Sequence, residues 1–315
     1  MTDLKIPASV SPKARPEYRK NYAQLTNNSG HLLLIAGDQK VEHGNDDFFG
    51  PSINRDDANP EHLFKIAAAS QGGVLATHLG LISRYGKDYP SIPYIVKVNG
   101  KTNLGQEEKD SSKLWWPIEE IIKFKQQSGL KIVGIGYTVY LGGQYEAKML
   151  AKAAKAIYEA HQAGLTAIIW MYPRGKNIKE EDIHTIASGA GVAAALDADF
   201  VKIKYPYSAK NQKNVAVKFQ EAVQAAGRTK VICVGGSKRP VSALLEDTEK
   251  QIKISGAYGL AMGRNLHQRS LDEATRLSLA LGGIIFYKKN AKEANAIYNK
   301  KLAVKNSKSK FLGLF

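Results

Sequence analysis

The chain has 315 residues and only one cysteine, Cys233, so it can form no internal disulfide and no zinc site built from several thiolates. No segment approaches the ~20 consecutive apolar residues that a membrane-spanning helix needs. The first twenty residues contain no apolar run, which argues against a signal peptide. We therefore expect a cytoplasmic protein that does not bind a membrane.

Several ligand-binding motifs are also missing. The seven histidines are spread along the chain, and no H-x-x-H or H-E-x-x-H pair occurs, so we expect no metal site. There is no Walker loop and no G-x-G-x-x-G segment, which argues against a nucleotide cofactor.

The charge balance is strongly basic, with 45 Lys and Arg against 29 Asp and Glu and a net charge of +16. Such a balance raises the question of nucleic-acid binding. The lysines are scattered, however, and no aromatic-basic motif, zinc-finger spacing or helix-turn-helix pattern accompanies them. We expect no nucleic-acid partner, and read the positive charge as favouring solubility and anionic substrates.

Eight short apolar runs alternate with helical patterns between residue 31 and about residue 282. The strand-like runs are 31–38, 73–80, 94–100, 131–139, 166–173, 199–206, 230–236 and 257–265. The helical patterns include 60–71, 117–128, 144–163, 179–195, 211–226, 240–254 and 268–281.

This alternation predicts an α/β fold. Runs that are apolar throughout suit a parallel sheet covered on both faces, and eight strand-helix units favour a closed (β/α)8 TIM barrel. An open doubly wound sheet is the alternative. We expect the barrel to span 31–282, with an N-terminal extension, 1–30, and a helical, lysine-rich C-terminal extension, 283–315. Functional residues should lie where the strands end.

The sixth strand-like run contains two lysines, Lys202 and Lys204, in the segment DFVKIKY. Side chains alternate across a strand, so both should face the barrel interior, ~6.5 Å apart, while Val201 and Ile203 face the helices. Burial and a neighbouring ammonium both lower the pKa of a lysine, and the neutral amine can then attack a carbonyl. The alternative is that one or both lysines lie exposed or salt-bridged at the rim.

Other strand ends carry polar or glycine-rich segments. Asp38 follows the first strand and Tyr172 ends the fifth, where the alternatives are a helix cap and a packing residue. Glycines let backbone amides approach a phosphate, and the loops after the last two strands are the recurrent phosphate site of these barrels. The candidates there are Gly235, Gly236, Ser237, Gly263 and Arg264.

These segments resemble one known family. ADFVKIKY resembles the Schiff-base strand of archaeal-type class I fructose-bisphosphate aldolases and, more distantly, that of deoxyribose-phosphate aldolases. GDQKVEHGN looks like the D-H-G-x-E-H-G segment of the same family, although Gln39 and Lys40 replace its usual His-Gly. WMYPRG, VGGSK and MGRN also stand where the family has similar motifs.

The resemblance implies residue roles. Lys202 would form the Schiff base, with Lys204 as the second candidate, and Asp38 would orient groups around it. Tyr172 would transfer protons and Trp170 would line the site. The glycines and Arg264 would bind a substrate phosphate.

The implied function is reversible cleavage of fructose 1,6-bisphosphate without a metal or other cofactor, by a large homo-oligomer that could be built from pentamers. A sister enzyme, such as aminodideoxyheptulosonate synthase or another phosphoketose aldolase, would share these motifs. A barrel that binds sugar phosphate without catalysis is the alternative from another class.

Overall fold

The structure, a computed structural model, describes residues 4–105, 111–176, 178–207 and 214–300. Residues 211–213 of one predicted helix and 301–315 of the predicted C-terminal extension lie outside the described residues.

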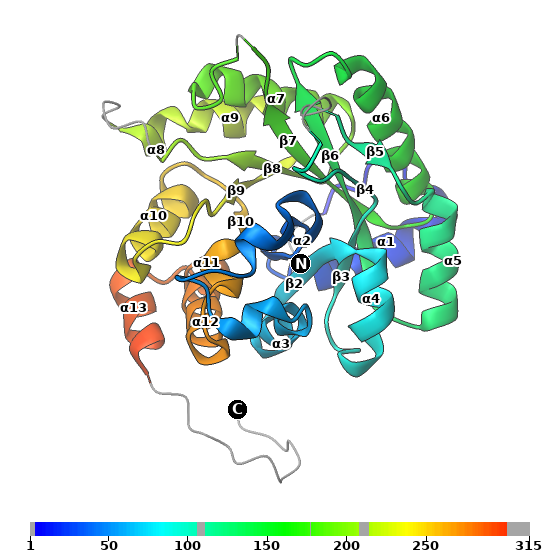
Figure 1. The fold of residues 1–315 in the computed structure, drawn as a ribbon. Coiled ribbons are helices and arrows are strands. Elements are labelled where there is room, and N and C mark those ends of the chain that lie inside the picture. The colour runs from blue at the N-terminus through cyan, green and yellow to red at the C-terminus, as the bar shows by residue number, and fades with distance from the viewer. Residues whose placement is uncertain (1–3, 106–110, 177, 208–213, 301–315) are drawn as a thin grey trace.

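Eight parallel strands close into a barrel in the order β1-β10-β9-β8-β7-β6-β3-β2 (Figure 1). They are β1 (Leu32–Ala36), β2 (Gly73–His78), β3 (Tyr94–Lys97), β6 (Ile132–Leu141), β7 (Thr166–Pro173), β8 (Phe200–Lys204), β9 (Lys230–Val234) and β10 (Gly259–Met262). Each falls within or overlaps one of the eight predicted runs. The (β/α)8 barrel is therefore confirmed, and the open sheet is wrong.

Helices surround the barrel (Figure 1). The α-helices are α1 (Arg15–Leu25), α2 (Gln39–Glu42), α3 (Glu61–Ala69), α4 (Leu79–Tyr85), α5 (Ile118–Ser128), α6 (Glu146–Gln162), α7 (Ile183–Ala195), α8 (Val215–Lys218), α9 (Gln220–Ala225), α10 (Val241–Lys253), α11 (Arg264–His267), α12 (Leu271–Tyr287) and α13 (Ala291–Asn299). Short 3-10 helices are η1 (Pro12–Ala14), η2 (Gly44–Asp47), η3 (Arg55–Ala58) and η4 (Gly86–Asp88). A two-stranded hairpin, β4 (Asn99–Gly100) with β5 (Lys113–Leu114), was not predicted.

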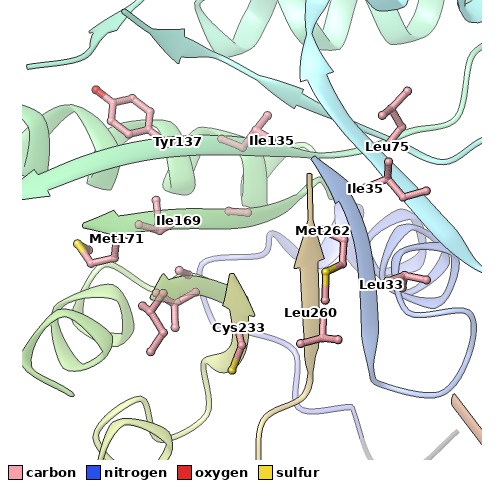
Figure 2. Packing of buried hydrophobic residues seen from close by; sticks show 14 of the residues in the cluster. Leu33, Ile35, Leu75, Ile135, Tyr137, Ile169, Met171, Cys233, Leu260 and Met262 are labelled. Atoms are coloured by element: carbon pink, nitrogen blue, oxygen red, sulfur yellow. The ribbon is translucent and has the colours of Figure 1, made fainter. Parts of the chain in front are cut away.

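The strands bury both of their faces, as their continuous apolar sequences predict. Side chains of one parity, such as Leu33, Ile35 and Ile169, pack outward against the helices (Figure 2). Side chains of the other parity, such as Leu34 and Ile168, fill the barrel interior. Full burial of each such side chain stabilises the folded state by about 1.5–3 kcal/mol. The alternation therefore fixes which residues of each strand can face the site.

A glycine in β6 makes room for the largest side chain of the interior. A Cβ atom at Gly136 would lie 2.4 Å from the ring of Trp170, which is fully buried. Only glycine therefore fits at position 136, beside the Trp170 ring, in the present packing. The ring in turn forms the floor beneath the strand ends.

Helix α1 closes the amino end of the barrel, because Tyr18, Tyr22 and Leu25 join the interior core. The Tyr18 hydroxyl donates to Asp199, and Nε2 of His161 lies 3.1 Å from the other oxygen of that carboxylate. Burial lowers the pKa of His161, but its bonds to Asp197 and Asp199 outweigh that effect and raise it to about 9. Since Asp199 immediately precedes β8, this cluster fixes the strand that contains Lys202.

None of the helices in the described part of the chain is long and apolar enough to cross a membrane.

Candidate active site

A cleft of about 370 Å³ opens at the carboxyl ends of the strands. The residues that line it include Asp38, Glu42, Tyr172, Lys202 and Arg264. A larger recess of about 770 Å³ lies at the amino end beside α1. The buried Tyr18 and Asp199 of that recess already bond to each other, whereas the cleft contains the predicted reactive groups.

Lys202 is a deeply buried ionisable group of the cleft. Its residue is 2% exposed, its Nζ lies 4.0 Å from Oδ1 of Asp38, and the same nitrogen lies 4.8 Å from the centroid of the Trp170 ring. Burial lowers the pKa of Lys202, while the carboxylates of Asp38 and Glu42 act in the opposite direction. The lowered pKa makes this amine more available as a nucleophile at neutral pH.

Asp38 begins the turn that leads from β1 into α2 and is 1% exposed. Burial alone would raise the pKa of its carboxyl group, but the charges of Lys202 and Lys97 outweigh that effect and lower it. Its Oδ1 atom accepts no hydrogen bond from the described residues. An ionised carboxylate with a free oxygen beside the lysine can orient a hydroxyl group of a bound molecule.

Tyr172 extends from the end of β7 to the cleft wall. Its ring stacks on Tyr140 with centroids 6.1 Å apart, and the Arg174 guanidinium lies 5.5 Å from the Tyr172 ring centroid. Burial, followed by the charges of Asp38 and Glu42, raises the pKa of Tyr172. The resting side chain is therefore a neutral phenol, which can donate a proton.

The two lysines of β8 differ in their surroundings. The prediction that both face the interior is correct for Lys202 and wrong for Lys204, whose side chain is 38% exposed at the cleft mouth. Lys204 Nζ lies 3.6 Å from Glu180 and 3.1 Å from Glu181. At the strand end, solvent and the acidic residues before α7 surround the Lys204 side chain.

The glycine-rich loops lie as expected after β9 and β10, but only part of each faces the cleft. Gly236, Gly263 and Arg264 line it, whereas Ser237 is exposed outside it. The Gly235 amide donates to the Ala261 carbonyl at 2.9 Å, so that N–H continues the barrel ladder and does not face a ligand.

Asn265 organises the loop after β9, which the sequence did not indicate. Its Nδ2 group donates to the carbonyls of Gly235, Gly236 and Ser237 at 2.9, 3.3 and 2.9 Å. These bonds gather three carbonyl groups on one side of the loop. The only available signal was its position directly after Arg264 in the MGRN segment.

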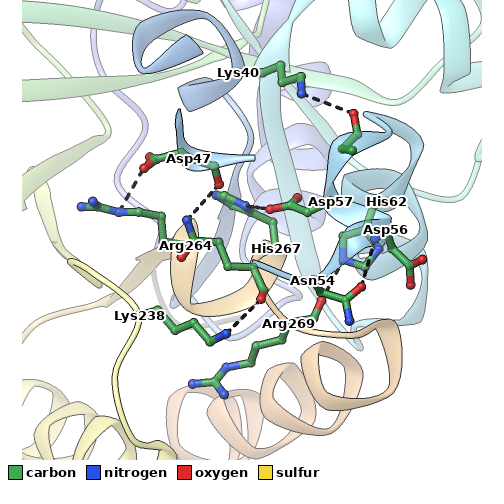
Figure 3. A network of polar contacts seen from close by, with 12 residues as sticks. Lys40, Asp47, Asn54, Asp56, Asp57, His62, Lys238, Arg264, His267 and Arg269 are labelled. Atoms are coloured by element: carbon green, nitrogen blue, oxygen red, sulfur yellow. Dashed lines mark hydrogen bonds and ion pairs between the residues drawn. The ribbon is translucent and has the colours of Figure 1, made fainter. Parts of the chain in front are cut away.

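Arg264 projects from the start of α11 and is held by an acidic residue of η2. Its Nε lies 3.8 Å from Oδ2 of Asp47 (Figure 3). The next turn is fixed by His267, whose Nδ1 lies 2.7 Å from Asp57 and whose ring stacks on Phe48. The long ion pair leaves the guanidinium free to contact an anion as well.

The structure places three further polar residues beside these candidates. Lys97 is completely buried and lies 3.2 Å from Glu42, a residue of the GDQKVEHGN segment for which no role was predicted. His78 is buried against Trp115, and burial lowers its pKa to about 4, so that it is neutral at physiological pH. Among the described residues, no group of three or more His, Cys, Asp and Glu side chains could hold a metal ion.

A buried lysine with a lowered pKa, placed beside a carboxylate and a phenol at the carboxyl end of a (β/α)8 barrel, defines a lysine-dependent carbonyl enzyme. Residues 32–269 match the model of the DeoC/LacD family aldolases, and the chain belongs to this family.

Curated relatives agree with this family. The chain is 50% identical over 297 residues, 94% of either sequence, to the fructose-bisphosphate aldolase/6-deoxy-5-ketofructose 1-phosphate synthase of Methanocaldococcus jannaschii. It is 32% identical over 261 residues to the class 1 fructose-bisphosphate aldolase of Thermoproteus tenax, covering 82% of this chain and 90% of the relative.

Solved structures agree as well. The fructose-bisphosphate aldolase of Slackia heliotrinireducens superposes with a TM-score of 0.91 and 44% identity, covering 96% of this chain and 97% of that one. A Schiff-base-forming fructose-1,6-bisphosphate aldolase superposes with a TM-score of 0.72 and 30% identity, covering 85% of this chain and 100% of that one.

Proposed function

We propose that this chain is a class I fructose-1,6-bisphosphate aldolase, an aldehyde-lyase that forms dihydroxyacetone phosphate and glyceraldehyde 3-phosphate reversibly. The observation that carries the proposal is Lys202, an amine 2% exposed and 4.0 Å from Asp38 at the base of a cleft. The names of the relatives supply the substrate. Lys202, Tyr172 and Asp38 are the proposed catalytic residues.

The reaction begins with attack of the neutral Lys202 amine on the C2 ketone, which gives a carbinolamine. The Tyr172 phenol donates a proton to the carbinolamine hydroxyl, which leaves as water. The product is an iminium ion joining Lys202 to C2, and Tyr172 is left as a phenolate. Asp38 stabilises the positive charge and orients the sugar hydroxyls.

Cleavage uses the same two groups. The Tyr172 phenolate accepts the proton of the C4 hydroxyl, and the C3–C4 bond breaks. Its electron pair forms the C2–C3 double bond while the π pair of the iminium moves onto nitrogen, so glyceraldehyde 3-phosphate leaves and an enamine remains. Protonation at C3 and addition of water then release dihydroxyacetone phosphate and free Lys202. No cofactor takes part in these steps.

A bisphosphate requires anion-binding groups at both ends of the cleft. Gly236, Gly263 and Arg264 supply one end, as proposed from the sequence, while Gly235 and Ser237 shape that loop. Lys101 and Arg174, which lie 5.2 and 5.1 Å from the Tyr140 ring centroid, supply positive charge at the opposite wall. Trp170 supports Lys202 from below, and Lys204 adds positive charge at the mouth.

A second candidate function follows from the relative with 50% identity, whose name includes a 6-deoxy-5-ketofructose 1-phosphate synthase activity. That product has one phosphate, so one anion site would suffice to bind it. The same lysine chemistry, run toward bond formation, would serve both reactions. Other phosphoketoses, including substrates of an aminodideoxyheptulosonate synthase, remain the alternatives from the sequence.

Turnover assays test the proposed function directly. We expect purified protein to cleave fructose 1,6-bisphosphate faster than other phosphoketoses, and to keep its activity after exhaustive treatment with EDTA, because the iminium supplies the electron sink. Loss of activity on chelation, with recovery on adding a divalent metal, would contradict the lysine mechanism. Binding of sugar phosphate without any turnover would favour a non-catalytic barrel.

We expect Arg264→Ala to lower kcat/KM for the bisphosphate by ~30- to 1000-fold. The reason is the loss of a charge-assisted contact to phosphate worth ~2–4 kcal/mol in a partly desolvated cleft. Most of the change should appear in KM if the contact is equal in the ground and transition states. An unphosphorylated ketose is the control, since wild type and variant should use it equally poorly. Unchanged use of the bisphosphate would place the phosphate elsewhere.

Two further expectations stay predictions. The first is a homo-oligomer, for which we propose an assembly of pentamers; it is supported by exposed apolar side chains such as Tyr287 and Phe49, which are 65% and 66% exposed in the single chain. Light scattering would measure its mass. A cytoplasmic location is the other expectation.

A further inference from the structure

A second buried lysine lies beside Glu42, a residue that lines the cleft, and takes no part in the steps above. Lys97, the last residue of β3, is 0% exposed. Its Nζ donates to the Asn99 carbonyl at 2.7 Å, to Asn99 Oδ1 at 3.2 Å and to Glu42 Oε1 at 3.2 Å. All three ammonium hydrogens thus have acceptors, so Lys97 is unsuited to act as a nucleophile.

The position of Lys97 is fixed from the neighbouring strand. Asn99 Nδ2 donates to the Thr138 carbonyl at 2.8 Å, and its Oδ1 accepts from the Thr138 amide at 2.8 Å. Thr138 is in turn paired in register with Trp170. The ammonium is therefore tied through β6 to the ring beneath Lys202.

The two lysines approach the same tryptophan. Lys202 Nζ lies 4.8 Å and Lys97 Nζ 5.7 Å from the Trp170 ring centroid. Each is accompanied by one carboxylate, since Asp38 lies 4.0 Å from Lys202 and Glu42 lies 3.2 Å from Lys97. The cleft floor thus contains two acids and two bases in close proximity.

This arrangement matters because the proposed reaction needs Lys202 without its proton. Two carboxylates facing one lysine would stabilise its ammonium form and delay attack on a carbonyl. A fixed positive charge on Lys97 cancels the field of one carboxylate. The Glu42 carboxylate then does little to hold a proton on Lys202.

Other groups near Lys202 leave this balance unchanged at neutral pH. His78 and Tyr172 are neutral, as described above. Lys204 is paired with Glu180 and Glu181 at the mouth, and Arg264 with Asp47 at the edge of the cleft. Lys97 is therefore the buried positive charge available to offset Glu42.

We infer that Lys97 is a positioning residue which, paired with Glu42, balances the charge of the cleft floor so that Lys202 meets the substrate carbonyl as a neutral amine. The importance of this charge balance for catalysis rests on the proposed function. The charge balance itself can be measured without substrate.

The test uses opposite single variants and their combination. Lys97→Met removes the offsetting charge, so the acid limb of the kcat/KM profile should move to higher pH. Glu42→Gln removes an acid, so the limb should move to lower pH. Unit charges about 10 Å apart in a partly desolvated site give shifts of about one pH unit. The double variant Lys97→Met/Glu42→Gln restores the balance, and its limb should lie close to that of wild type.

Competitive acetylation of Lys202 with trace acetic anhydride, followed across pH by mass spectrometry, reports its titration without requiring aldol turnover. Lys40→Met is the matched control, because Lys40 lies on α2 near Glu42 but contacts the Ala58 carbonyl and the Phe48 ring outside the cleft. The acid limb of the kcat/KM profile of Lys40→Met should lie at the same pH as that of wild type.

Opposite shifts of the acid limb in the two single variants, which cancel in the double variant, support the inference. Loss of turnover or of thermal stability with an unmoved acetylation profile would show a purely structural role and overturn it. If the acetylation profiles shift as expected but wild type shows no aldol cleavage, the proposed function fails while the charge balance stands.

Discussion

Replacing Lys202 by methionine should abolish turnover, with a loss of at least ~10⁴-fold, and should also abolish the covalent adduct that borohydride traps with dihydroxyacetone phosphate. The Lys202 nitrogen is the protein atom that forms the covalent bond to a substrate carbon in the proposed mechanism. Methionine has similar length, and its apolar side chain suits the position over Trp170, so the barrel should still fold. Peptide mapping of the trapped wild-type protein should locate the adduct on Lys202.

Lys204→Met is the matched control, because it removes a lysine of the same strand and parity whose side chain is 38% exposed. The adduct on Lys202 should persist in this variant. Modification of wild type on Lys204 alone would reassign the nucleophile, and absence of any adduct would contradict the Schiff-base mechanism.

The lysine strand illustrates what sequence alone could predict. Period-two alternation places Lys202 on the same face as Phe200, and the structure has Phe200 in the interior core and Val201 among the outward side chains. Since backbone geometry enforces this alternation, the inward direction of Lys202 followed from its neighbours. Alternation says nothing about depth, however, which is why Lys204 was wrongly placed inside.

The amino-terminal helix shows a second limit. Residues 1–30 looked like an extension, because α1 has a polar composition and no strand-like run precedes it in the sequence pattern. Its Tyr18, Tyr22 and Leu25 nevertheless belong to the interior core. A cap is recognisable only once the barrel end that it covers is known. The division of the chain at 31 and 282 stays a prediction, and α12 continues past that second position to Tyr287.

Long-range pairing accounts for the other omissions. Lys97 lies within the predicted strand-like run 94–100, but its partner Glu42 lies on α2, fifty-five positions earlier in the chain. No local pattern indicates that these two side chains meet. No local pattern indicates the pairing of Arg264 with Asp47 either. The motifs therefore located the site, whereas the charge pairs within it required the fold.

Tyr172→Phe should lower kcat for cleavage by ~10²–10⁴-fold while leaving phosphate binding intact. The phenol is held at the cleft wall against Tyr140, and its raised pKa makes it a proton donor in the resting enzyme. Removing the hydroxyl takes away the proton for the carbinolamine and the acceptor for the C4 hydroxyl, but keeps the aromatic ring and its packing. Single-turnover measurements should show slower iminium formation and slower cleavage.

Tyr140→Phe provides the comparison, since Tyr140 belongs to the same aromatic pair at the end of the neighbouring strand and has no step in the proposed reaction. Its effect on kcat should be far smaller than that of Tyr172→Phe. Equal losses in the two variants would indicate that the aromatic pair only shapes the cleft. Near-normal turnover in Tyr172→Phe would mean that another group transfers the protons, and Asp38, whose Oδ1 accepts no hydrogen bond from the described residues, would be the next to test.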